Sequence, residues 1–470
     1  MGERRRFYVN VSGSNPEVTG SCTLCTVNYP DGTSEKIIID CGSFQEKDYE
    51  EYNNSFQFDP QSIKACLLTH CHTDHVGQLP LLSKEGYSKK VYATKDTNLI
   101  LNYSLMDNYK IMKEKRKHKK EKPLYSEEHV ENALSLRKTV LYNKSFQVTP
   151  NIKATYFNNG HVIGGAIIAL QISYQKEEDI VLVFTGDFHC SNIFYDIEQL
   201  PDWLLKSNVT IVQESTYGDI DSKSIKKCYN ENISKAISKK KTIIVPVLAL
   251  KAAEMLYRTK IMQDKGLLDT SIPIYLDGTL AKNYVELYNK QFDIKEEMKD
   301  FFPENFNFVD KTIRAGILNS SEPKIIFTTS GMGSFGTAPL YISKFIQDEN
   351  ALIHFVNYLA KGSLGDILKS VNLDEEVEIN GKEMVKKAEV KFTSEFSSHA
   401  KADEMVEFLK KFEKIQAIIS CHGETKVKQK FSKRIQKEIK VKASLILGRN
   451  NIIKISHYGF LKEYPKAYSL

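Results

Sequence analysis

The chain has 470 residues and a formal net charge of +6, with 65 Lys and Arg against 59 Asp and Glu. This length allows roughly two or three domains with sizeable cores. No apolar stretch reaches the ~18 residues of a transmembrane helix, and residues 1–6 lack the apolar segment of a secretory signal. The eight cysteines are scattered and favour free thiols. We therefore expect a soluble, cytoplasmic protein without a membrane partner.

Short β-rich runs dominate the first 215 or so residues; they include 36–40, 65–69, 90–93 and 180–185. Residues 95–138 are predicted to be mainly helical, with a break at Pro123. From 218 to 390 helices alternate with strands, and the predicted strands are 242–247, 274–276, 324–328 and 351–356. This alternation is typical of a parallel α/β layer. After residue 390 we expect a helix at 401–412, a strand at 417–420 and a closing β segment at 443–455.

One short segment, 69–75, follows the apolar run 65–68 and carries four metal-binding side chains: His70, His72, Asp74 and His75. The chain has only 11 histidines, so chance is a poor explanation for three of them here. A turn leaving the strand can aim the first two imidazoles at one metal, while the Asp and the last His reach a second. Such N and O donors with an open position are typical of catalytic zinc, and two metals ~3.5–4 Å apart suit phosphoryl displacement. A polar surface turn is the alternative.

Positive charge is concentrated in residues 110–122, which hold eight Lys and Arg and two Glu. Their net charge of +6 equals that of the whole chain, so the remaining residues are formally neutral. Such a run suits contact with a phosphate backbone. The candidate contacts are Lys115, Arg116, Lys117, Lys119 and Lys120. An equally weighted alternative is a solvated helix or loop without a ligand.

The H-x-H-x-D-H pattern of 70–75 resembles the second motif of the metallo-β-lactamase fold. Asp40, which ends the apolar strand 37–40, resembles the first motif. His161 in 160–165 resembles the third motif, and Asp187 in 184–187 resembles the fourth. The motifs occur in order, each at the end of a predicted strand, and the resemblance covers nearly the whole chain.

A second resemblance, to the β-CASP insertion and the motifs after it, rests on 214–218, 274–277, 330–332 with Gly336, 362–365, 396–399 and 420–424. β-CASP proteins are metallo-β-lactamase-fold nucleases, and this chain looks most like short relatives of the mRNA 3′-end processing endonuclease. The resemblance implies an α/β protein, a metallo-β-lactamase αββα sandwich with an inserted α/β β-CASP domain. The hydrolase domain would comprise 1–217 and 391–470, and the insert 218–390 would cap the metal cleft.

The same resemblance implies a site for two Zn²⁺. One zinc would be held by His70, His72 and His161. The other would be held by Asp74, His75 and His422. Asp187 would bridge the two ions together with a hydroxide, which implies hydrolysis by a metal-activated hydroxide.

Three further residues are implied to assist. Asp40 would orient a ligand or the hydroxide, and His399, held by Glu214, would protonate the leaving oxygen. Each residue also has a simpler interpretation: Asp40 as a strand-end turn residue, Glu214 as a surface acid, His399 as a neighbour of a helix N-cap. His422 could likewise pack against the sheet edge.

The chain departs from the family pattern away from the predicted ligands. Lys401 stands two residues after His399, where an acid is usual, and Asp366 occupies an often basic position. The segment 246–254 lacks the usual Gly-Arg and Gln, although Lys251 can supply a charge facing phosphate. Lys251, Ser330 and Gly331 complete the predicted RNA contacts.

The resemblance thus implies a zinc-dependent ribonuclease that acts on single-stranded RNA, with the balance of endonuclease and 5′-exonuclease activity left open. One alternative is a DNA nuclease on the same scaffold, but His422 favours RNA because DNA-acting members typically carry Val there. The other is a non-catalytic scaffold subunit of a processing complex, which the seven retained ligands oppose. A homodimer stays an open alternative.

Overall fold

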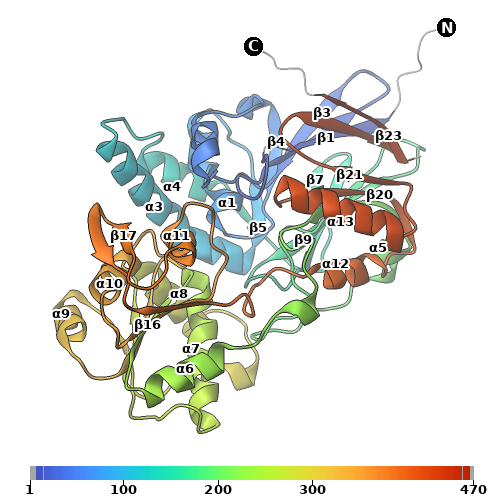
Figure 1. The fold of residues 1–470 in the computed structure, drawn as a ribbon. Coiled ribbons are helices and arrows are strands. Elements are labelled where there is room, and N and C mark those ends of the chain that lie inside the picture. The colour runs from blue at the N-terminus through green and yellow to red at the C-terminus, as the bar shows by residue number, and fades with distance from the viewer. Residues whose placement is uncertain (1–6, 14, 458, 466–470) are drawn as a thin grey trace. The chain divides into compact units, whose positions relative to one another are not determined.

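The computed structural model describes residues 7–13, 15–457 and 459–465, so the segment 1–6 considered for a signal lies outside the described residues. The chain divides into two compact units, whose elements are labelled in Figure 1. The first comprises Met1–Asn192, Asp196–Ser222 and Ser398–Leu470, and the second comprises Ile193–Tyr195 and Lys223–Ser397. Among the described residues, no helix combines the length and the apolar character needed to cross a membrane.

The first unit contains two sheets. The eight-stranded sheet has the order β23-β22-β1-β2-β3-β4-β5-β6. Its strands are β1 Tyr8–Gly13, β2 Thr23–Asn28, β3 Ser34–Ile39, β4 Ile63–Leu67, β5 Val91–Thr94, β6 Arg137–Val140, β22 Asn451–Ser456 and β23 Gly459–Pro465. The seven-stranded sheet has the order β21-β20-β11-β10-β9-β8-β7. Its strands are β7 Phe146–Thr149, β8 Ile152–Asn158, β9 Ala166–Ile172, β10 Ile180–Phe184, β11 Asn208–Glu214, β20 Lys414–Cys421 and β21 Ala443–Ile446.

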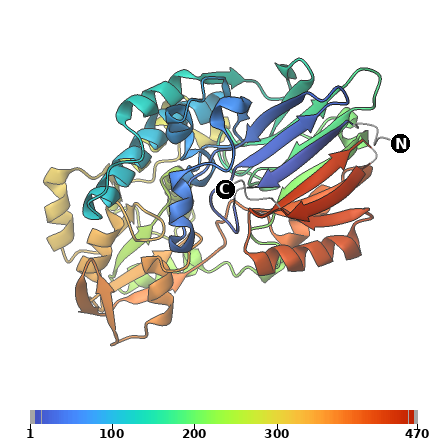
Figure 2. The same cartoon turned by 90° about the horizontal axis from the view of Figure 1, so that it is seen from above.

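Strands from the C-terminal part of the chain complete both sheets. β1 pairs antiparallel with β22, so the N-terminal and C-terminal strands lie side by side, blue beside red in Figure 2. In the other sheet β20 runs parallel to β11, with Glu214 opposite Cys421. This register brings the residues that follow β20 next to those that follow β11.

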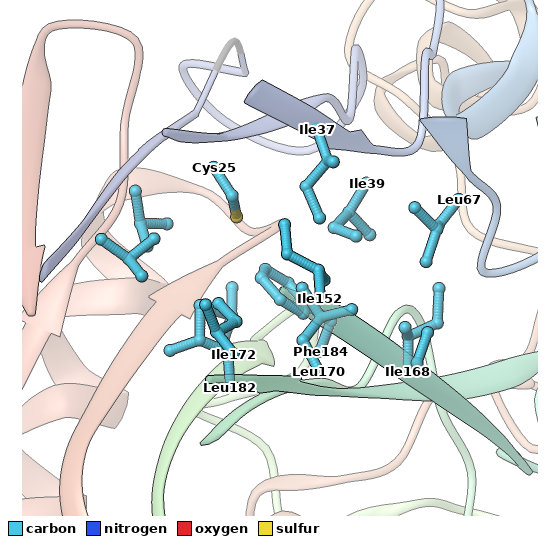
Figure 3. Packing of buried hydrophobic residues seen from close by; sticks show 14 of the residues in the cluster. Cys25, Ile37, Ile39, Leu67, Ile152, Ile168, Leu170, Ile172, Leu182 and Phe184 are labelled. Carbon is cyan, nitrogen blue, oxygen red and sulfur yellow. The ribbon is translucent and has the colours of Figure 1, made fainter. Parts of the chain in front are cut away.

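Apolar side chains from the two sheets fill the space between them (Figure 3). The eight-stranded sheet contributes Ile37, Ile39 and Leu67, and the seven-stranded sheet contributes Leu170 and Phe184. Side chains alternate between the faces of a strand, so residues two apart such as Ile37 and Ile39 enter the same core. Full burial of one such side chain stabilises the fold by roughly 1.5–3 kcal/mol.

Helices cover the outer faces of both sheets. On the eight-stranded sheet a core of buried side chains joins β3, β4 and β5 to α2 Leu79–Lys84, α3 Lys95–His118 and α4 Glu127–Ser135. On the seven-stranded sheet a third core joins β9, β10, β11 and β20 to α5 Asp202–Lys206, α12 Ala402–Leu409 and α13 Thr425–Glu438. The layers are therefore α, β, β and α, and the predicted fold class is confirmed.

The second unit is built on a six-stranded parallel sheet of order β14-β13-β15-β12-β16-β19. Its strands are β12 Thr242–Pro246, β13 Ile274–Asp277, β14 Phe306–Phe308, β15 Lys324–Thr328, β16 Ala351–Phe355 and β19 Glu389–Phe392. Its helices are α6 Tyr229–Ser238, α7 Ala252–Asp264, α8 Thr279–Lys290, α9 Lys311–Asn319, α10 Ala338–Phe345 and α11 Leu364–Ser370. A small hairpin pairs β17 Glu376–Ile379 with β18 Lys382–Val385. The alternation of strands and helices matches the parallel α/β layer expected from sequence.

Two details differ from the sequence-based expectation. The closing segment 443–455 is not one β element, because β21 joins one sheet and β22 the other. Asn451 makes the turn between them, accepting from Gly448 N at 2.9 Å and donating to Ile446 O at 2.7 Å. In addition, the boundary predicted at 390/391 falls inside β19, which pairs with β16. The parallel sheet thus continues beyond the predicted end of the insert.

Candidate metal centre

The predicted ligands lie where several strands of the first unit end. The segment after β4 leads into the short helix α1 Thr73–Val76, and further ligands follow β8, β10 and β20. In chain order these side chains are His70, His72, Asp74, His75, His161, Asp187 and His422. They form two groups of donor atoms that share Asp187, and the atoms of each group lie within 4.8 Å of one another.

The first group consists of three imidazoles and one carboxylate. Nδ1 of His72 lies 3.0 Å from Nε2 of His70 and 3.2 Å from Nε2 of His161. Oδ2 of Asp187 lies 3.6 Å and 3.7 Å from these two Nε2 atoms. Two nitrogens bound at ~2.0–2.1 Å to a tetrahedral zinc would be roughly 3.3–3.4 Å apart. The group therefore has the spacing of ligands around a single metal ion.

The second group consists of two imidazoles and two carboxylates. Nε2 of His75 lies 3.4 Å from Asp187 Oδ2 and 3.8 Å from Asp74 Oδ2. Nε2 of His422 lies 3.4 Å from Asp74 Oδ2. His75 Nε2 is buried and makes no well-aligned hydrogen bond among the described residues. A buried polar atom normally has a bonding partner, and here a bound cation would be that partner.

Burial keeps the imidazoles of the first group neutral. It lowers the pKa of His70 and His161 well below the usual value and that of His72 to about 4. A neutral imidazole offers a lone pair to a metal, whereas a protonated one cannot. The three side chains are therefore suited to metal binding at neutral pH.

The second group carries strong opposing charges. Burial disfavours the charged form of His75, but Asp187 and Asp40 outweigh it and raise its pKa well above the usual value. Burial likewise disfavours charge on Asp187, yet His422 and His75 hold its pKa well below the usual range. Asp40, Asp74 and Asp187 thus concentrate negative charge in a poorly solvated place. A bound cation would offset that charge.

Asp40 holds His75 in place from behind. Its Oδ1 accepts from Thr69 N at 2.7 Å, and its Oδ2 accepts from Thr69 Oγ1 at 2.7 Å and lies 2.8 Å from His75 Nδ1. With Nδ1 occupied, Nε2 of His75 is directed to the metal-binding group. Asp40 has a φ of +64°, which is uncommon for a residue with a side chain. This carboxylate therefore does more than terminate a strand.

His399 and Glu214 form a pair beside the centre. Nδ1 of His399 lies 3.1 Å from both carboxylate oxygens of Glu214. Glu214 is only 1% exposed and accepts from Phe188 N at 2.8 Å, so it is not a surface acid. The ring centroid of His399 lies 4.7 Å from that of His161, and its side chain is 18% exposed. His399 is thus adjacent to the donor groups and within reach of solvent.

Three contacts to the histidines were not predicted. Thr69 Oγ1 lies 3.1 Å from His70 Nδ1 and joins it to Asp40. Thr216 Oγ1 lies 3.0 Å from His422 Nδ1, and Ser398 O accepts from His161 Nδ1 at 2.9 Å. Both threonines lie within motifs that the sequence singled out. Nothing in those motifs shows which hydroxyl will hydrogen-bond to an imidazole.

The unusual Lys401 is buried rather than solvated. It is 5% exposed, its Nζ donates to the carbonyl oxygen of His399 at 3.3 Å, and the same nitrogen lies 3.7 Å from the ring centroid of Tyr217. The aromatic face partly offsets the cost of burying an ammonium group. Lys401 therefore contacts the backbone of His399 and the segment that follows Glu214.

The basic run forms the end of α3 and the turn after it. Among its candidate RNA contacts, Arg116 pairs with Glu121 at 3.1 Å and Lys119 pairs with Glu50 at 2.8 Å. Cations at a helix C-terminus also stabilise the helix itself. Their position is thus compatible with both interpretations weighed from sequence.

The remaining candidate RNA contacts lie in the second unit. Lys251 pairs with Glu254 at 2.7 Å, so its charge is largely compensated within the same segment. Ser330 and Gly331 lie in the loop that follows β15. His354 in β16 is fully buried and accepts from Asn232 Nδ2 at 3.0 Å, as expected for a core histidine.

The fold and the paired donor groups define a metal-dependent hydrolase of the metallo-β-lactamase superfamily. Residues 31–190 match the metallo-β-lactamase superfamily domain, and residues 252–368 match the Beta-Casp domain. Residues 383–445 match the Zn-dependent metallo-hydrolase RNA specificity domain.

Similar proteins include ribonuclease TTHA0252 of Thermus thermophilus, 30% identical over 427 residues that cover 88% of this chain and 92% of that protein. The RNase J-like protein of Methanocaldococcus jannaschii is 27% identical over 425 residues, 86% of this chain and 91% of its own. Transcription termination factor FttA of Methanothermobacter thermautotrophicus is 26% identical over 449 residues, 88% of this chain and 66% of its own. The chain belongs to the β-CASP family of metallo-β-lactamase-fold nucleases, and the family predicted from its motifs is confirmed.

Proposed function

We propose that this protein is a zinc-dependent ribonuclease that hydrolyses the phosphodiester bonds of single-stranded RNA. The observation that carries the proposal is the pair of donor groups sharing Asp187, with the His399–Glu214 pair next to them. Two of the similar proteins are named as ribonucleases or RNase J-like, and residues 383–445 match an RNA specificity domain. These similarities favour RNA over DNA as the substrate.

In this proposal His70, His72 and His161 would hold one zinc ion, and Asp74, His75 and His422 would hold the other. Asp187 belongs to both donor groups and would serve both sites. Nitrogen and oxygen donors of this kind suit zinc. Bound zinc would lower the pKa of water towards ~7 and so provide a hydroxide nucleophile at neutral pH.

The residues around the two donor groups have separate tasks. Asp40 keeps His75 oriented through its Nδ1. Glu214 contacts Nδ1 of His399, which leaves Nε2 of that ring to donate a proton to the leaving oxygen. The carboxylate of Glu214 also stabilises the positive charge that His399 carries before it donates. His399 is the general acid in this scheme, and Glu214 and Asp40 are positioning residues.

The test uses purified protein with RNA labelled at the 5′ end or internally, with and without a chelator, beside DNA of the same sequence. We expect chelator-sensitive cleavage of the RNA that leaves a 5′-phosphate and a 3′-hydroxyl, while the DNA stays intact. We propose endonucleolytic cleavage, which releases internal fragments, whereas 5′-exonuclease action releases the 5′ label as a mononucleotide first. Cleavage of the DNA at a similar rate would make the protein a DNA nuclease. RNA binding without cleavage in zinc-loaded protein would make it a scaffold.

A further inference from the structure

Exposed apolar side chains gather at one edge of the second unit's sheet. β15, β12 and β16 are neighbouring parallel strands, so the segments that follow them leave from the same edge. Twelve large hydrophobic side chains are exposed among the described residues. Three of the twelve, Leu248, Phe335 and Tyr358, lie in the segments directly after these strands, and two more, Leu340 and Ile367, lie in the helices α10 and α11 that come next. Single exposed apolar residues are ordinary, but a concentration at one edge indicates a binding surface.

Phe335 and Tyr358 are the two aromatic members of this set, with 48% and 37% of their surface exposed. The loop that carries Phe335 is closed by Ser330, whose N donates to Phe335 O at 3.0 Å and whose Oγ accepts from Phe335 N at 3.3 Å. The loop of Tyr358 is fastened by its neighbour Asn357, which donates to Pro246 O at 3.0 Å. Both rings are therefore presented by loops with fixed backbones.

Gly331 brings the three loops together. A Cβ atom at this position would lie 2.6 Å from Asn357 Nδ2 and 2.8 Å from Leu248 N. Both distances are shorter than van der Waals contact, so the loops after β12, β15 and β16 meet at a point that only glycine allows. The segments of Leu248, Phe335 and Tyr358 are consequently neighbours at one place.

The surface also carries a cation. Lys361 is exposed three residues after Tyr358. The turn that follows it is braced by Asp366, whose Oδ2 accepts from Gly362 N at 2.9 Å. Asp366 therefore stabilises the turn at Gly362. Aromatic rings and an exposed cation carried by neighbouring loops suit an unpaired nucleic acid strand, which offers flat bases and a negative backbone together.

We propose that Phe335 and Tyr358 form a stacking platform for unpaired bases of the RNA substrate, with Lys361 close to the strand's phosphates. This inference rests on the proposed ribonuclease function and deepens it. Stacking on aromatic rings accepts every base, so the platform would favour single-stranded RNA without selecting a sequence. Paired bases are inaccessible to it because their faces are covered by neighbouring base pairs.

The test measures fluorescence anisotropy of labelled oligouridine bound to the full chain, in an H399A background that slows cleavage during the measurement. The double variant F335A/Y358A should bind oligouridine roughly 5- to 150-fold more weakly for each ring lost. An abasic ribose-phosphate strand of the same length should bind equally to both proteins, because it has no bases to stack. The aromatic variant F335W/Y358F should keep the original affinity, which separates ring loss from misfolding.

A matched control is L267A/L373A, which removes two side chains of the same unit that are 46% and 60% exposed. This variant should bind oligouridine like the parent protein. If the parent binds oligouridine and F335A/Y358A binds it equally well, the platform is refuted while the proposed function stands. If the parent binds no RNA, the proposed function fails first. If the double variant loses only self-association in sedimentation experiments, this surface joins copies of the chain instead.

Discussion

The sharpest test of the mechanism is the substitution His399→Ala, because it separates proton donation from metal binding. His399 contacts both oxygens of Glu214 at 3.1 Å, as expected for an oriented general acid. Yet its donor atoms also lie within 4.8 Å of those of Asp187, Glu214 and His422, a group that could itself hold a metal. The geometry thus leaves two roles to distinguish by experiment.

We expect His399→Ala to lower kcat by about 10²–10⁴-fold, the usual contribution of a general acid. Zinc content should stay near that of the parent protein, because both proposed ligand groups remain whole. His72→Ala removes one of four donors in the first group and should lose zinc and activity together. His189→Ala is a matched control, since Nδ1 of His189 hydrogen-bonds locally with Ser191.

The assay compares cleavage rates on ordinary RNA and on RNA with sulfur in place of the leaving 3′ oxygen, with zinc measured by elemental analysis. A thiol has a pKa of ~8.5, so a thiolate leaves without needing a proton donor. The loss caused by His399→Ala should therefore shrink strongly on the sulfur substrate. An equal loss on both substrates, or zinc depletion matching that of His72→Ala, would refute the assignment of His399 as the acid.

Four further predictions follow from other residues. Carefully prepared protein should contain about two zinc ions per chain and lose activity with chelator; elemental analysis without stoichiometric transition metal, or cyclic-phosphate products, would contradict this. Neutralising the basic run at Lys115, Arg116, Lys117, Lys119 and Lys120 should weaken binding to all RNA sequences alike and flatten the salt dependence of log K by ~0.7 for each lost contact. An unchanged slope in a binding titration would leave that run as a solvated helix end. Lys401→Met should lower kcat about tenfold at constant KM and zinc content, with recovery in Lys401→Arg, because Lys401 positions His399; a lower melting temperature with unchanged kcat would make it purely structural. Burial lowers the pKa of His354 to about 4, so the unfolded chain binds more protons below pH ~6.5 and stability should fall as pH drops from there towards ~4. Urea unfolding should show a smaller loss in His354→Gln, and equal pH dependence would contradict the assignment.

The sequence by itself determined the family and the fold class, and it singled out the side chains that the structure brings together in the two candidate donor groups. Donors such as His70, His72 and His75 could be recognised because they are close in sequence and follow an apolar strand. His161, Asp187 and His422 could be recognised because each lies in a motif of the family. The alternating strands and helices of the second unit could likewise be predicted, since a parallel α/β layer requires that order along the chain.

The family motifs imply that Glu214 holds His399, but only the tertiary structure shows how these two residues come together. His399 and Glu214 are 185 residues apart, and their contact depends on β20 pairing with β11 and on the backbone contact between Ala400 and Phe188. The same holds for the burial of Lys401 against Tyr217 and for the contact of Thr216 with His422.

The last strand of the parallel sheet could also not be predicted from the sequence, because β19 is short and its place is set by pairing with β16. The local pattern of apolar and polar residues indicates which face of a helix or strand is buried. Contacts between segments distant in sequence depend instead on how whole sheets and helices pack. That is why the side chains of the candidate site and the pairing of His399 with Glu214 could be inferred from motifs, whereas the contacts of Thr216 and Lys401 could not.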